Sequence, residues 1–205
     1  MTTTQLFAEL LVIGIGGVLW LSLAVASIFG YRFNKGFPQV DPLLLIALGG
    51  IAYLLGIVID RLAFSIFGNF EKKNQELVLG KSGMPTARVI ERYILLNSDK
   101  LASQILYNRS RLRICRAWIL NFALITLAFT GWNLRVKALS FSQWFGITTL
   151  SIGLCFLTAW IALTLSRDHY KNILESYEFL ISDSAPKQLS LAVTASPEER
   201  RATEL

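Results

Sequence analysis

The chain has 205 residues, a hydrophobic fraction of 53% and a formal net charge of +6. This composition excludes an ordinary soluble domain, because the apolar residues fall in four blocks at 10–30, 43–59, 117–134 and 144–165. A helix needs roughly 20 apolar residues to cross the hydrocarbon core of a bilayer. The sequence therefore predicts an all-α, polytopic membrane protein with four transmembrane helices in two antiparallel hairpins.

The first hairpin is predicted over residues 1–68, with spans at about 8–30 and 42–62. Its short loop contains FPQVDP, and Pro42 suits an early helix position. The segment Ala24–Ala26 resembles a signal-peptide cleavage site, but no Lys or Arg precedes the apolar run. We therefore expect the first span to be an uncleaved helix.

Asp60 is the ionisable residue placed deepest in the first hairpin. Ala52, Gly56 and Asp60 are spaced by four residues and share one helical face, where small residues allow close helix contact. This spacing predicts that Asp60 points into the bundle. The favoured interpretation is a residue at the membrane interface, with Arg61 reaching the phosphates. A structural pair within the membrane is the second interpretation, and ion or proton handling is the third.

A polar layer at the cytoplasmic edge of the bundle is predicted from Glu9, Asp60, Arg61 and Asn121. Glu9 and Arg61 have similar predicted depth, so they can pair, and Asn121 lies near the same level. The favoured alternative for Glu9 is an interaction of its carboxylate with the helix dipole.

The segment 69–116 is predicted to be a cytoplasmic linker followed by a long helix. Glycine and proline interrupt LGKSGMP at 79–85, whereas residues 86–116 contain neither. We therefore expect one helix from 86 that continues unbroken into the third span. The second hairpin then covers 117–166, with spans at about 117–134 and 144–165.

A second amphipathic cytoplasmic helix is predicted at 167–183, followed by a flexible tail at 184–205. Each amphipathic helix needs a partner for its apolar face. We expect the helices at 86–116 and 167–183 to pack against one another as a helical extension of the bundle.

The stretch RSRLRICR at 109–116 directly precedes the third span. Arg109, Arg113 and Arg116 share a helical face, and basic residues at this depth attract anionic lipid headgroups. Contact with the bilayer is the favoured role. An acidic protein partner or a pair between subunits of a homo-oligomer is the alternative. Nucleic acid is disfavoured, because its binding also needs aromatic residues for stacking.

The distribution of Lys and Arg predicts the topology. Alternate segments carry fifteen basic residues against four, which places both termini and the segment 69–116 in the cytoplasm. The cell inner membrane is the expected location.

The sequence contains no recognisable catalytic constellation. His169 is the only histidine, while Cys115 and Cys155 differ in predicted depth. We therefore assign no catalytic, cofactor-binding or metal-binding residue and expect no cofactor.

A non-enzymatic scaffold or effector, with cytoplasmic helices for self-association or partner docking, is the leading functional hypothesis. An oligomeric ion channel or small transporter with a polar layer around Asp60 is the alternative. A membrane enzyme acting on lipid is the third.

Overall fold

The computed structural model describes residues 3–31, 41–80, 86–137 and 139–194, with side chains up to residue 182. All regular secondary structure in these ranges is helical. The helices are α1 (Thr3–Phe29), α2 (Pro42–Leu79), α3 (Ala87–Asn97), α4 (Asp99–Val136) and α5 (Phe141–Thr194).

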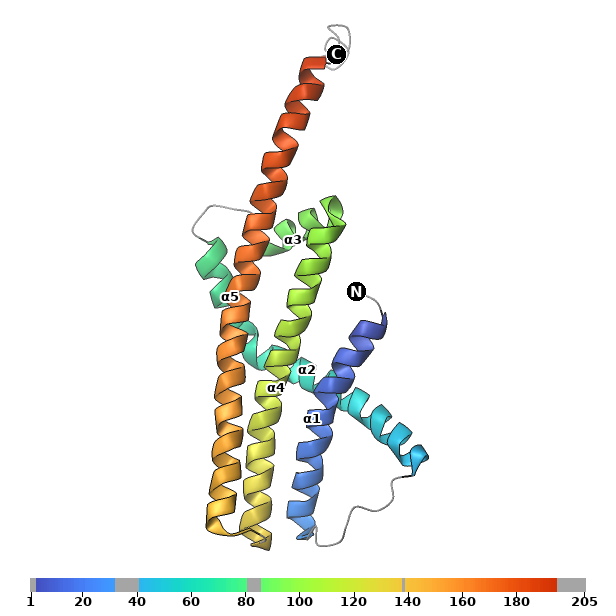
Figure 1. The fold of residues 1–205 in the computed structure, drawn as a ribbon, viewed down its shortest axis with the longest axis vertical. Coiled ribbons are helices and arrows are strands. Elements are labelled where there is room, and N and C mark those ends of the chain that lie inside the picture. Colours follow the sequence, from blue (N-terminus) through green and yellow to red (C-terminus); the bar gives the residue numbers. More distant parts are fainter. Residues whose placement is uncertain (1–2, 32–40, 81–85, 138, 195–205) are drawn as a thin grey trace.

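Four of these helices, α1, α2, α4 and α5, are long and apolar enough to cross a membrane. The predicted all-α polytopic membrane fold is confirmed. Figure 1 shows α1, α4 and α5 running side by side, while α2 crosses α1 obliquely. The first residues of α1 and the last residues of α5 both point towards the end of the molecule that contains α3 (Figure 1). At 1.5 Å per residue, the 54 residues of α5 span about 80 Å, far more than the roughly 30 Å of hydrocarbon.

Small residues bring α1 and α2 into backbone contact. A Cβ atom at Gly14 would overlap the backbone of Ala52, and a Cβ atom at Gly56 would overlap the carbonyl group of Leu10. Ala52 and Gly56 are both buried. The predicted small-residue face of α2 is therefore the face that meets α1.

Helices α4 and α5 form the second hairpin. The hydroxyls of Thr126 and Ser151 lie 2.7 Å apart, and Cys155 Sγ donates to the carbonyl oxygen of Ile119 at 3.6 Å. At the turn, Lys137 adopts a left-handed conformation with φ 49° and ends α4. Ser151 and Cys155, which lie one helical turn apart on α5, therefore face α4.

Beyond the hairpins lies a second apolar core, formed by α3, the start of α4 and the later part of α5. We call α3, residues 99–116 of α4 and residues 167–182 of α5 the stalk. Its core contains Ile90, Ile94, Ile105 and Ile173, each with 4% or less of its surface exposed. Packing of the two amphipathic segments against one another is confirmed.

The prediction of one unbroken helix from 86 into the third span is wrong. Ser98 is extended, with φ −155° and ψ 109°, and separates α3 from α4. Its hydroxyl accepts a hydrogen bond from the Leu101 amide at 3.4 Å, which caps the first turn of α4. The break lets Ile90 and Ile94 of α3 pack into the same core as Ile105 of α4.

Helix α5 also passes its expected end at 183 and continues to Thr194. Residues 195–205 of the predicted tail lie outside the described residues.

The close crossing of α1 and α2 predicts opposite effects for two alanine substitutions on α2. Gly56→Ala should lower the free energy of unfolding by about 1–3 kcal/mol, because its methyl group meets backbone atoms. Gly50→Ala has nothing within 4 Å of the added atom, so it should be neutral or stabilising by up to ~1 kcal/mol. Thermal unfolding in detergent, followed by circular dichroism, measures both. Equal midpoints for the two variants would contradict the crossing.

Candidate functional site

Three helices of the bundle meet at the guanidinium group of Arg113 on α4. Its Nη2 lies 2.8 Å from Asp60 Oδ2, and its Nε donates to Asp60 Oδ1 at 3.3 Å, so the pair is bidentate. Its Nη1 lies 3.9 Å from Glu9 Oε2 on α1. The Ser110 hydroxyl donates to the other oxygen of Glu9. One cation therefore serves the carboxylates of both α1 and α2.

Asn121 lies two helical turns deeper on α4 and is fully buried. Its Nδ2 donates to the Ile13 carbonyl oxygen of α1 at 2.9 Å. This contact needs Gly16, because a Cβ atom there would overlap the Asn121 side chain. A glycine of α1 thus makes room for a polar contact between α1 and α4.

A second charged pair links α4 to the end of α2. Arg116 Nη1 lies 2.6 Å from Glu71 Oε2, with side-chain exposures of 9% and 17%. The guanidinium group also lies 5.7 Å from the ring centre of Phe64. One turn further along α2, Asn74 Nδ2 donates to the Ser166 hydroxyl of α5 at 3.3 Å. Polar contacts therefore tie α2 to both helices of the second hairpin.

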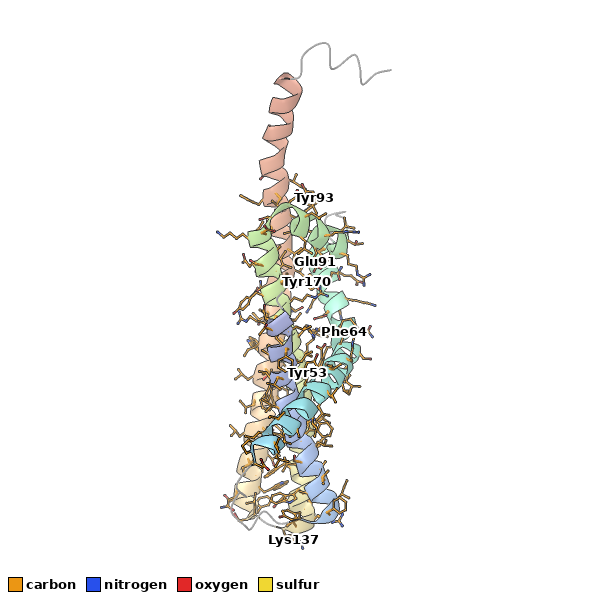
Figure 2. All side chains as sticks on the ribbon, turned by 90° about the vertical axis from the view of Figure 1, so that its right-hand side faces the viewer. Tyr53, Phe64, Glu91, Tyr93, Lys137 and Tyr170 are labelled. Atoms are coloured by element: carbon orange, nitrogen blue, oxygen red, sulfur yellow. The ribbon has the colours of Figure 1, made fainter. Side chains whose placement is uncertain are left out.

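A looser charged group joins the helices of the stalk. Glu91 of α3 lies 3.9 Å from His169 Nε2 and 4.0 Å from Arg109 Nη1. His169 is buried, whereas the Arg109 side chain is 62% exposed. In Figure 2, Glu91 and Tyr170 lie beyond Phe64 towards the stalk, and Lys137 lies at the opposite end of the molecule.

These groups surround an open polar cavity of about 540 Å³ between α2, α3, α4 and α5. We call it the arginine cavity, because its wall contains Arg61, Arg88, Arg109, Arg113 and Arg116. A smaller apolar slot of about 210 Å³ lies between α2, α4 and α5. The two spaces share Glu71, Leu112 and Arg116 in their walls.

The predicted site residues fall into two groups in the structure. Glu9 and Asp60 converge on Arg113, and Asn121 lies deeper in the same bundle. Arg61 is exposed, and the predicted pairing of Glu9 with Arg61 is wrong, because α4 presents Arg113 to Glu9 instead.

Each of the three arginines predicted to share one face lies beside a carboxylate. Arg109 lies beside Glu91 of α3, whereas Arg113 and Arg116 both lie beside carboxylates of α2. Arg113 and Arg116 are turned into the molecule, and Arg109 remains exposed.

Sequence reasoning missed the partners of these arginines. The sequence does not predict four residues of the site: Glu71, Glu91, Ser110 and His169. One signal was present: Glu71 lies eleven residues after Asp60, which is three helical turns and hence the same face of α2. The contribution of Glu91 depends on the break at Ser98. The signal for this break is the run Asn97-Ser98-Asp99, whose residue types cap helices.

Among the described residues, no group of three or more His, Cys, Asp or Glu side chains could hold a metal ion. Comparisons with protein families, with characterised proteins and with solved structures give no match. Function is therefore argued from the geometry alone.

The pairing at Arg113 predicts unequal effects for two neighbouring residues on α2. Asp60→Asn should lower the free energy of unfolding by roughly 1–3 kcal/mol, because a partly buried guanidinium group loses a charged partner. Arg61→Gln should change it by no more than about 0.5 kcal/mol, because Arg61 is exposed. Denaturant titration in detergent micelles measures both.

The double variant Asp60→Asn with Arg113→Met should lower the free energy of unfolding by less than the sum of the two single variants. Simple additivity would show that the two side chains do not interact energetically.

Proposed function

We propose that this chain is a non-enzymatic multi-pass membrane scaffold whose stalk docks an acidic protein partner. The supporting observation is the charge on the outer surface next to the membrane bundle. Among the described side chains of the stalk, the exposed acidic residues are Asp99, Asp168, Glu175 and Glu178. The exposed basic residues of the stalk are Arg88, Arg92, Lys100, Arg109, Arg111, Arg167 and Lys171, so basic residues outnumber acidic ones by seven to four.

The stalk is well suited to present such a surface in a fixed orientation. Its apolar core joins α3 to α4 and α5, and the edge-to-face contact of Tyr93 with Tyr177, 5.6 Å between ring centres, adds to it. Helices α4 and α5 run from the bundle into the stalk without interruption. A partner bound to the stalk would therefore be held at a defined distance from the membrane.

The same excess of positive charge supports a cytoplasmic stalk in the cell inner membrane. In the sequence, the segment 69–116 and the segment from 166 onwards carry fifteen basic residues, and the two short segments that connect the spans within each hairpin carry four. Lys and Arg accumulate in cytoplasmic loops, so both termini are assigned to the cytoplasm.

An acidic partner is favoured over a second copy of this chain, because like charges brought together at an interface are repulsive. A scaffold is favoured over a channel for a separate reason. The Asp60 carboxylate, the residue on which the channel hypothesis depended, is engaged by Arg113.

Charge reversal on the stalk tests this function. The tagged full-length chain is purified in mild detergent from its native membrane, and the protein mass of the complex is measured by light scattering. The wild-type complex should exceed the 22.9 kDa of one chain and contain a second, acidic protein. Arg92→Glu with Lys100→Glu should reduce it to a single chain, because the partner is then repelled.

Arg135→Glu is a charge-reversal control away from the stalk, because Arg135 is exposed at the opposite end of α4. It should leave the complex intact. A wild-type mass of one chain, or of copies of this chain alone, would contradict the proposal. Equal loss with Arg135→Glu would show that the stalk is not the docking surface.

A further inference from the structure

The arginine cavity and the apolar slot are neighbouring spaces of opposite character. The cavity wall is mostly charged or polar, whereas the slot is lined by Phe67, Phe70, Ile119, Ala159, Ala162 and Leu163 besides a few polar groups. Both contain Glu71, Leu112 and Arg116 in their walls, so they meet at the charged pair of α2 and α4. A ligand that fills both must be polar at one end and apolar at the other.

The charge of the cavity favours an anionic polar end. The five arginines of the wall face three carboxylates of the wall, Asp60, Glu71 and Glu91, and Arg113 also lies beside Glu9. This leaves a surplus of one positive charge when His169 is neutral. Each carboxylate already lies beside an arginine. Within the described residues, Arg61 and Arg88 have no ion-pair partner and are exposed at the cavity. Guanidinium groups bind phosphate well, because their paired N–H donors match its oxygens.

The cavity wall also contains hydrogen-bonding groups that the protein itself leaves unsatisfied. Arg116 and His169 have side-chain exposures of 9% and 5%. Yet Arg116 Nε, His169 Nδ1 and Glu71 Oε1 have no hydrogen-bond partner among the described residues. Buried polar groups are normally paired, so the two nitrogens remain able to bind a ligand that accepts hydrogen bonds.

The slot is suited to a hydrocarbon chain and is accessible from the side of the bundle. Phe70 and Leu163 in its wall are exposed, so the slot opens where α2 and α5 border the membrane. Its mouth lies close to the level of Arg116, directly before the apolar run of α4. This is the depth at which lipid headgroups meet acyl chains.

We propose that the arginine cavity and the apolar slot together form a binding site for one anionic phospholipid. Its phosphate group lies among the arginines of the cavity, and part of one acyl chain enters the slot. The lipid then joins α2, α3, α4 and α5 at the junction of bundle and stalk. This inference does not depend on the docking function proposed above.

Lipid titration followed by native mass spectrometry tests the site. The full-length chain in detergent is titrated with phosphatidylglycerol, with phosphatidylcholine of identical acyl chains, and with glycerol 1-phosphate. We expect one phosphatidylglycerol per chain, bound at least about fivefold more tightly than phosphatidylcholine. Glycerol 1-phosphate, which has no chain to fill the slot, should bind much more weakly.

Variants separate the cavity from general attraction to basic residues. Arg61→Gln and Arg88→Gln should each weaken phosphatidylglycerol binding by about fivefold, the contribution of one basic residue near an anionic headgroup. Arg111→Gln removes the same charge from an exposed position on α4 outside the cavity, and it should have no effect. Ala159→Phe, which fills the slot, should weaken binding although all five arginines of the cavity remain.

Three results would overturn the proposal. Equal weakening by Arg111→Gln would mean that the lipid is held by an unspecific basic collar. Equal affinity for phosphatidylcholine would remove the role of charge. Binding of glycerol 1-phosphate as tightly as phosphatidylglycerol would mean that the cavity takes free phosphate esters and the slot takes no chain.

Discussion

The arrangement of the helices depends on the ion pairs of Arg113 with Asp60 and Glu9. Arg113 lies four residues before the apolar run of α4 and is mostly buried, so an uncompensated charge would be costly. Asp60 and Glu9 neutralise it from two other helices. A rotation or a one-turn shift of α1, α2 or α4 would leave a carboxylate or the guanidinium group without its partner. The pairing therefore selects one register among the many that an apolar bundle would accept, because contacts between apolar helices in lipid are weakly specific.

The small residues of α1 and α2 make this pairing geometrically accessible. Gly56 lies one turn before Asp60, and it meets Leu10, the residue next to Glu9. The close crossing thus lies beside the charged residues and delivers both carboxylates to the same cation. Gly16 of α1 leaves space for the side chain of Asn121 on α4. Glycines therefore join α1 to α2 through contacts with backbone atoms, and α1 to α4 through contact with a polar side chain.

The elements set by local pattern could be predicted from the sequence, and those set by long-range geometry could not. Four apolar runs were sufficient for the membrane fold, and the spacing of Ala52, Gly56 and Asp60 indicated the inward face of α2. The predicted partner of Glu9 is wrong, because Arg61 and Arg113 have similar predicted depth. They differ in the direction they face: Arg113 points towards α1, and Arg61 is exposed. The break at Ser98 is not predicted, because the apolar spacing from Ile94 to Leu101 continues across it, although Ser is a residue type that caps helices. Glu91 could not be placed in the site for the same reason, since that break brings α3 back against α5.

The reversal at Ser98 also determines how far the protein reaches from the membrane. An unbroken helix from 86 would carry its first residues away from the bilayer as a lone rod. Instead, α3 packs beside α4 and α5 near the bundle, and only α5 continues outward (Figure 1). The part of α5 after the stalk thus sets how far the protein extends from the membrane, and α3 sets how wide the protein is near the membrane surface. A change in the length of α5 after the stalk would alter only the height, and a change in α3 would alter only the footprint.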